Sequence, residues 1–377
     1  MSLLRSISSL FSFRPLVYGY ANARAHGMFS EFLSGAQMNE MISRRTVQSL
    51  TESLQRTPYK QDIVDLSLRF KEEELIELAL GKNFARFAKK LLEITPIQDR
   101  DVIKAILARW DAHNIKAIIL AKKQKKTYEQ IAPFLVLAGT LTREKLKPML
   151  EAQTSEEFYS LLRATEFGAG LLSMPSSYTD SSVKEMILSM GKGDAALEPI
   201  LGALDAYAYH LVADVSFASE KDMKTVSSLL SRIAYRKNLS TVLRLTAAGA
   251  SPEQIKHYIV PGGKFTARQW VSMAASQNIE QIMQKLSRQL PVATAMEEYK
   301  KTKKLSSIEV AVSQENAKKS LKQFRYAQLS LGIIVGALLF KEQEVSNIRK
   351  IVRGKALGLH EDEIKKMMVM VKSERAS

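Results

Sequence analysis

The stretch NIRKIVRGKALGLHEDEI, residues 347–364, is the third copy of a unit that the chain also carries at 114–131 (NIKAIILAKKQKKTYEQI) and at 238–255 (NLSTVLRLTAAGASPEQI). Within each copy, apolar residues recur at spacings of three and four, which predicts an amphipathic helix. The copies lie 124 and 109 residues apart, far more than the 20 to 50 residues of common solenoid repeats. Each repeat is therefore the size of a domain. The landmarks that coincide are Asn114, Asn238 and Asn347 at the start, and Ile131, Ile255 and Ile364 at the end.

Each copy also contains a helix stop followed by a helix start. The restart fits a capping box, in which two side chains three residues apart satisfy free backbone N–H groups at a helix N-terminus. The third copy has histidine in place of the hydroxyl residue, which predicts a weaker cap. The pairs are Thr127 with Gln130, Ser251 with Gln254, and His360 with Glu363.

The likeness extends downstream of the first two copies. Leu141-Thr142 and Phe265-Thr266 are again 124 residues apart, and the third copy ends too early to include this tail. The N-terminus supplies a match, because Leu33-Ser34 opens a similar pattern 108 residues before Leu141-Thr142. The third repeat is thus predicted to be split between the two ends of the chain, as a closed or nearly closed ring of three units requires.

The predicted fold class is all-α, with three similar helical domains in a pseudo-threefold ring. Helical spacing recurs nearly everywhere, and the alternating patterns of strands are scarce. Pro- and Gly-containing breaks divide the chain into four segments. These are residues 1–57, N-terminal helices that complete the third repeat; 58–164, the first repeat; 165–290, the second; and 291–377, the third.

The composition is that of a globular chain. With 377 residues, of which 46% are hydrophobic, the chain is long enough for two or three domains with substantial buried cores. The absence of Cys excludes disulfides, thiolate zinc sites and cysteine nucleophiles, and suits an intracellular protein. The longest apolar run, LSLGIIVGALLF at 329–340, has 12 residues, too few to span a bilayer, and predicts a buried helix.

The charge is strongly basic. Lys and Arg outnumber Asp and Glu by 55 to 39, and the net charge of +16 favours encounters with phosphate, anionic headgroups or acidic protein surfaces. The basic run AKKQKK at 121–126 is more typical of a solvated helix face than of a binding site. One alternative function is a basic helical-repeat scaffold that binds nucleic acid or a membrane surface. Nucleic acid is disfavoured, because acids and bases are interspersed and few aromatic residues accompany the basic runs.

No pattern of catalytic or cofactor-binding residues stands out. The histidines are scattered without the one-turn pairing that places two metal ligands on one helix face. MGKGDAAL at 190–197 lacks the spacing of a phosphate-binding loop and predicts a turn between helices. We therefore predict no catalytic residue, no metal site and no cofactor. The histidines are His26, His113, His210, His257 and His360.

The N-terminal sequence MSLLRSISSLFSFRPLVYGY has two Arg, many Ser and no acidic residue. This composition is typical of a transit peptide or of an amphipathic segment on a membrane surface. A helical pattern follows at once, however, and disfavours a targeting segment. Residues 1–17 are interpreted as an added leader.

Three stretches carry a resemblance to a known family. They are YGYANARAHGMFSEFL at 18–33, WDAHNIKAIILAK at 110–122 and FKEQEVSNIRKIVRGKALGLHEDEI at 340–364. Together they resemble the C subunits of archaeal and bacterial A-type (V-type) ATP synthases, the counterparts of the d subunits of vacuolar ATPases. The resemblance spans residues 18 to 370, but 165–235 shows no signature of the family, and His26-Gly27 departs from its pattern.

The resemblance implies a non-catalytic rotor protein in which three helical domains form a funnel. In that family the protein is a socket between the membrane rotor ring and the central shaft, and it transmits torque during ion transport. Its implied partners are the proteolipids of the ring and the D and F subunits of the shaft, with one copy per complex and no nucleic acid. The implied location is peripheral, at the cytoplasmic face of the cell membrane.

Basic residues in the family-like stretches are the candidate partner-binding residues. In the third copy, Ile348, Ile351 and Val352 share one side of the predicted helix, which leaves the cations on another face. An exposed basic strip beside a membrane attracts anionic headgroups or acidic loops. The candidates are Arg24, Arg349, Lys350, Arg353 and Lys355.

Overall fold

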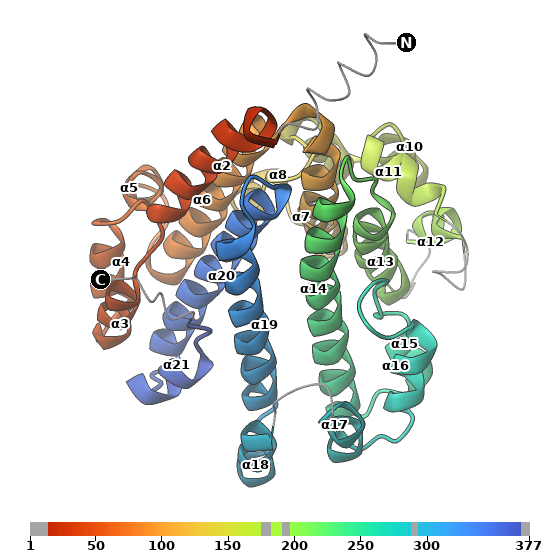
Figure 1. Cartoon of the computed structure of the whole chain (residues 1–377). Helices are drawn as coiled ribbons and strands as arrows, with labels where there is room; N and C mark the ends of the chain where they lie inside the picture. The colour runs from red at the N-terminus through yellow and green to blue at the C-terminus, as the bar shows by residue number, and fades with distance from the viewer. Residues whose placement is uncertain (1–13, 175–181, 191–196, 288–292, 371–377) are drawn as a thin grey trace, which may run out of the picture. The chain divides into compact units, whose positions relative to one another are not determined.

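The computed structural model describes residues 14–174, 182–190, 197–287 and 293–370 (Figure 1). The chain divides into two compact units. Unit 1 comprises residues 1–100, 217–226 and 291–377, and unit 2 comprises residues 101–216 and 227–290. Every regular element in the described ranges is a helix, which confirms the all-α prediction. Most of the predicted leader, residues 1–13, lies outside the described residues.

Unit 1 is built around two long helices that pack against each other, α6 (Glu72–Ile94) and α20 (Leu331–Ala356), and both contact α2 (Arg14–Ser30). The apolar run predicted to be a buried helix forms the N-terminal half of α20, where Ile334 and Leu338 have no exposed surface. The other helices of the unit are α3 (Gly35–Ser43), α4 (Val47–Leu54), α5 (Lys60–Ser67), η1 (Ile97–Asp99), α18 (Ala293–Thr302), α19 (Ser306–Tyr326) and α21 (Glu361–Met367).

Unit 2 contains most of two other long helices, α7 (Arg100–Lys123) and α14 (Glu220–Ala247), whose first residues belong to unit 1. One continuous apolar core joins α7 to the helices between residues 143 and 214. The remaining helices are α8 (Tyr128–Ile131), η2 (Ala132–Phe134), α9 (Arg143–Glu151), α10 (Ser155–Arg163), α11 (Glu166–Leu172), α12 (Val183–Ser189), α13 (Glu198–Asp214), α15 (Pro252–Lys256), α16 (Ala267–Ala274) and α17 (Ile279–Ser287).

The three landmark asparagines make the same contact. In each copy the side-chain NH₂ donates to the backbone carbonyl, and the side-chain oxygen accepts from the backbone N–H, of a valine 22 residues later, at 2.8–3.2 Å. Since each asparagine is at most 5% exposed, these bonds satisfy backbone groups that water does not reach. We call this contact the asparagine clamp. Its pairs are Asn114 with Val136, Asn238 with Val260, and Asn347 with Val369.

The predicted helix restarts are present in all three copies. The capping boxes begin α8, α15 and α21. The box at His360 is the weakest, because both of its hydrogen bonds measure 3.4 Å. The isoleucine that follows each cap is buried, as its helical position predicts, with exposed fractions of 7%, 0% and 0% for Ile131, Ile255 and Ile364.

A further contact links the N-terminal segment to the third copy. In unit 2, the carboxylate of Asp111 accepts a hydrogen bond of 2.8 Å from the N–H of Leu141. In unit 1, Glu344 stands at the matching position of α20 and accepts one of 2.6 Å from the N–H of Leu33. Leu33 is the residue predicted to correspond to Leu141, and α3, which follows it, packs against α20 and α21. The division into four segments remains a prediction.

In each copy the long helix ends at an equivalent position, and the residue there has a left-handed backbone conformation. Lys125, Gly249 and Gly358 coincide in the repeat and have φ values of +53°, +76° and +68°. In each case the following N–H bonds back to a carbonyl five residues earlier, as in a Schellman turn. The first copy therefore uses lysine where the other two use glycine.

Candidate interaction surfaces

The five candidate cations lie in unit 1, but the structure does not bring all of them together. Four lie in the C-terminal half of α20, whereas Arg24 is exposed on α2. Asn22 is hydrogen-bonded to Ser330, so α2 places Arg24 near the N-terminal end of α20. At a rise of 1.5 Å per residue, the N-terminal end of α20 lies about 25 Å along the helix axis from Arg349. Arg24 is thus a separate feature.

The two arginines of α20 are not free cations, because they share an acidic partner. Glu77 of α6 accepts from Arg349 at 2.7 Å and from Arg353 at 3.4 Å. The side chain of Arg353 remains 70% exposed, against 30% for Arg349. Arg349 therefore helps to join α20 to α6, and Arg353 is the more accessible of the two.

The two lysines of the strip are also partly engaged. Lys350 donates a 2.8 Å hydrogen bond to the carbonyl of Met367, at the end of α21, where a cation complements the helix dipole. Lys355 is half-buried. Of the five candidates, Arg24 and Arg353 are thus the most exposed to a partner.

A buried charged cluster joins the N-terminal segment to α20. Lys341, 4% exposed, donates to Glu344 at 2.7 Å and to the hydroxyl of Tyr59 at 3.0 Å. Its amino group also lies 4.4–5.8 Å from the ring centroids of Tyr59, Phe32 and Phe87, in a cation–π arrangement. Burial raises the pKa of Tyr59, and the charge and hydrogen bond of Glu344 raise it further. Every group of the cluster is bonded, so it serves to hold the fold together.

A second cluster forms where α2 meets the start of α14. Arg14 forms a two-bond salt bridge with Asp222, each bond 2.8 Å long. The hydroxyl of Tyr18 lies 2.8 Å from Asp99 Oδ2 and 3.2 Å from Asp222 Oδ2, whereas Asp99 Oδ1 is buried without a partner. Burial raises the pKa of Asp99 most, the Tyr18 hydrogen bond lowers it, and the nearby Asp222 carboxylate raises it again. The buried site thus destabilises the ionised form of Asp99 relative to the protonated form.

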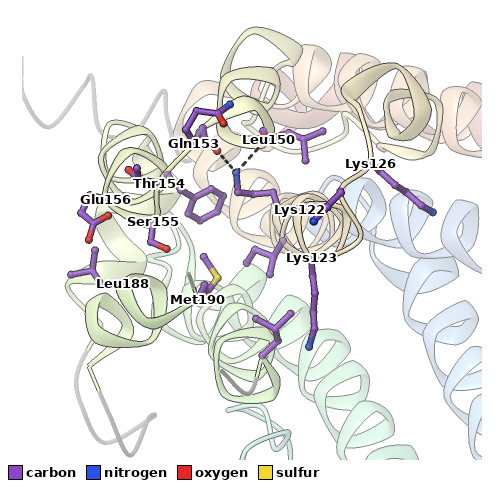
Figure 2. Close-up of a pocket in the computed structure, with 15 residues that line it drawn as sticks. Lys122, Lys123, Lys126, Leu150, Gln153, Thr154, Ser155, Glu156, Leu188 and Met190 are labelled. Carbon is purple, nitrogen blue, oxygen red and sulfur yellow. Dashed lines mark hydrogen bonds between the residues drawn. The ribbon is translucent and has the colours of Figure 1, made fainter. Parts of the chain in front are cut away.

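A lysine-rich groove of about 850 Å³ opens in unit 2 between the end of α7 and the start of α10 (Figure 2). Lys122 points across it and donates to the backbone carbonyls of Leu150 and Ala152. Burial lowers the pKa of Lys122, and the charge of Glu157 acts in the opposite direction. Phe158 and Met190 form part of the wall. We call this feature the lysine groove.

The lysine groove contains the run AKKQKK, which the sequence predicted to be a solvated helix face. Lys123, Lys125 and Lys126 are indeed exposed, so that prediction holds for their side chains. The pattern alone did not reveal the groove beside them, because its other wall comes from residues between 150 and 158 and from Leu188, Met190 and Leu197. One feature of the sequence could have drawn attention to this region: Lys125 aligns with glycine in both other copies.

Two kinds of site do not appear in the described ranges. There, no group of three or more His, Asp or Glu side chains is arranged to hold a metal ion. Over the same ranges, no helix combines the length and the apolar character that crossing a bilayer would require.

Comparison with known proteins places these features in context. The family model described as ATP synthase (C/AC39) subunit matches residues 21–367. The chain is 27% identical over 360 residues to the A-type ATP synthase C subunit of Methanocaldococcus jannaschii, covering 93% of this chain and 86% of that protein. The protein of the same name from Haloquadratum walsbyi is 28% identical, over 92% of this chain and 96% of its own length. That of Methanothermobacter thermautotrophicus is 26% identical, over 97% and 92%.

Proposed function

The chain belongs to the ATP synthase (C/AC39) subunit family, and we propose that it is the non-catalytic socket that couples the central shaft of a rotary ATPase to its membrane rotor ring. The single observation that carries this proposal is the extent of the family match, residues 21–367 of 377. A match of that length leaves no room within these 377 residues for a separate catalytic domain beside it.

The partners in this proposal are the proteolipids of the ring and the D and F subunits of the shaft. The chain would act as one copy per complex, peripheral to the membrane on its cytoplasmic face, without binding nucleic acid. Torque transmission requires a body that resists twisting. The asparagine clamps and the buried Lys341–Glu344 cluster support such a role, because they tie long helices to distant segments of their own unit.

The test is to tag the C-terminus in the native cell, solubilise membranes gently and identify the copurifying chains by mass spectrometry, with stoichiometry. The expected result is nucleotide-binding subunits, shaft subunits and proteolipid, with one copy of this chain per complex. ATP hydrolysis by the purified chain alone should be at background. Recovery of the chain in a soluble fraction with nucleic acid, and without ATPase subunits, would overturn the proposal and favour a basic scaffold.

A further inference from the structure

Lys125 holds a backbone conformation that favours glycine. Its φ of +53° lies in the left-handed region, where a side chain is strained and glycine is not. The chain satisfies this preference twice, with Gly249 and Gly358 at the equivalent positions. Strain that a fold retains points to a role for the side chain at that position. The first copy therefore keeps a lysine against a preference that the other two copies follow.

Three lysines around this turn, Lys123, Lys125 and Lys126, have no lysine counterpart in the other two copies, whereas Lys122 is matched by Lys355 in the third. Where it reads AKKQKK at 121–126, the second reads LTAAGA at 245–250 and the third GKALGL at 354–359. Lys123, Lys125 and Lys126 are exposed, and among the described residues none of them forms an ion pair. The backbone below them is fixed by the hydrogen bonds of the Schellman turn. Three uncompensated positive charges are thus presented on a well-defined turn.

The geometry of the groove restricts what these charges can bind. Figure 2 shows Lys122 directed towards Gln153 and Leu150, whereas Lys123 and Lys126 point in different directions, so they do not converge on one small anion. The groove is concave and about 850 Å³ in volume, and Phe158 forms part of its wall. A flat bilayer surface cannot enter such a groove. An extended anionic chain can lie in it and reach the diverging lysines with successive side chains.

We propose that the lysine groove is a docking surface for an acidic stretch of a partner polypeptide, with Lys123, Lys125 and Lys126 pairing with its carboxylates. Lys122, anchored on backbone carbonyls, forms part of the groove wall. The inference rests on a surface of unit 2 and on the chemistry of its ligand. It therefore stands or falls separately from the socket role.

A binding assay on the full-length chain tests the chemistry. The probe is a fluorescein-labelled peptide of ten glutamates, and its anisotropy is followed at several salt concentrations. The variant Lys123→Gln/Lys125→Gly/Lys126→Gln should bind at least about tenfold more weakly than the wild type, since three ion pairs are removed. The matched control Lys89→Gln/Lys300→Gln/Lys301→Gln removes equal charge from exposed lysines elsewhere and should lose less than about twofold. Equal losses in the two variants would mean that only net charge matters, and would overturn the proposal.

Lys125→Gly alone separates binding from folding. Because glycine relieves the left-handed strain, this variant should have a higher Tm than the wild type while it binds the peptide more weakly. A variant with higher Tm and unchanged peptide affinity would overturn the role assigned to the side chain. A lower Tm would overturn the argument from strain.

A second arm distinguishes a membrane from a polypeptide. Vesicles of phosphatidylglycerol mixed with phosphatidylcholine replace the peptide, and neutral vesicles serve as the blank. We expect the groove variant and the control variant to bind the anionic vesicles equally well. If the groove variant alone loses vesicle binding, and wild-type protein ignores the peptide, the surface is a membrane contact and the proposal is wrong.

The native assembly provides the last arm. A zero-length carbodiimide joins a lysine amine to a carboxylate only where the two are in contact. In the complex isolated through the C-terminal tag, we expect amide cross-links from Lys123, Lys125 or Lys126 to Asp or Glu of another chain. If all three lysines react with an acylating reagent as readily in the complex as in the isolated chain, the groove is unoccupied and the proposal fails. Copurification decides the socket role, and lysine reactivity decides the groove.

Discussion

At the scale of single residues, buried polar side chains do the most specific work in this chain. Each landmark asparagine satisfies both backbone groups of one valine, which no apolar residue of similar size could do. Lys341 and Glu344 are buried as a bonded pair, so the loss of either partner would leave the other charge without compensation. These contacts convert the repeat in the sequence into a repeat of structure.

Replacement of Asn114 by Ala tests the clamp in unit 2. The change leaves the N–H of Val136 without a partner, while its C=O keeps only the bond from the Ala138 N–H, and we expect the free energy of unfolding to fall by about 1–3 kcal/mol. Hydrogen exchange at the Val136 amide and the Tm of the chain measure the effect. Asn39→Ala removes an exposed asparagine of α3 and should change neither. Wild-type protection at Val136 in the Asn114 variant would contradict the assigned role.

Asp99 gives a prediction about pH. Because its folded-state pKa is raised, the folded chain binds a proton more tightly than the unfolded chain, and stability falls as pH rises from the unfolded pKa through the folded one. Asp99→Asn removes this contribution and still accepts the bond from Tyr18. We expect the variant to have a higher Tm than the wild type at pH 7, and the difference to shrink as the pH falls through the raised pKa and to vanish below the ordinary Asp value of 3.8. A difference that does not depend on pH would contradict this account.

At the scale of helices, the three copies share a pattern of long helix, left-handed stop and capped restart. The stop at Gly358 and the restart at His360 lie two residues apart, so α20 and α21 are joined by a turn with little freedom. The clamp from Asn347 to Val369 then fixes the chain just beyond α21. The geometry of the pair is thus set by local backbone bonds and by one long-range contact.

Proline placed within α20 tests how much unit 1 depends on that helix. Ile348 is fully buried in the middle of α20, and Ile348→Pro removes an interior hydrogen bond at a cost of about 3 kcal/mol or more. We expect the thermal unfolding transition of unit 1 to be lost when unfolding is monitored by circular dichroism. The matched control is Glu361→Pro, at the first position of α21, where the second copy already has Pro252. Destabilisation by the control as large as that by Ile348→Pro would contradict the argument.

The helices and their restarts could be predicted from the sequence because their signals are local. The three asparagines could be located but their contacts were not predicted, because the valine that each one holds lies 22 residues downstream, outside the repeated stretch that revealed the copies. The pairing of Glu77 with Arg349 joins residues 272 positions apart, and the interpretation of Arg349 as part of an open basic strip missed it. Charged residues in helical patterns are usually exposed, so the burial of Lys341 was equally invisible.

At the scale of the whole molecule, the basic residues of the described ranges fall into two classes. The cations behind the net charge of +16 are not gathered at one site, because some of them hold the fold together and others face solvent. Arg353 and the exposed lysines of the lysine groove belong to the second class. Attachment to partners should therefore depend on particular exposed cations and not on total charge.

The arginines of α20 provide the test at this scale. Reversal of both Arg349 and Arg353 to Glu would place three carboxylates together at Glu77, so the milder change Arg353→Gln separates attachment from folding. A largely exposed pair of this kind contributes about 0.2–1 kcal/mol, and Tm should hardly change. We expect weaker retention on membranes across a salt series. Glu77→Gln, which breaks the same pairs but keeps both cations, should be retained like the wild type.

The contact between Glu344 and Leu33 has a consequence for synthesis. The two residues are 311 positions apart, so at about 5–20 residues per second the N-terminal helices wait roughly 15–60 s before their acceptor leaves the ribosome. During that time α3, with its buried Met41, lacks the helices α20 and α21 against which it packs, whereas α4 can already contact α5 and α6. The nascent chain is therefore expected to need a chaperone at its N-terminal end, and unit 1 to become protease-resistant only after α20 has left the ribosome.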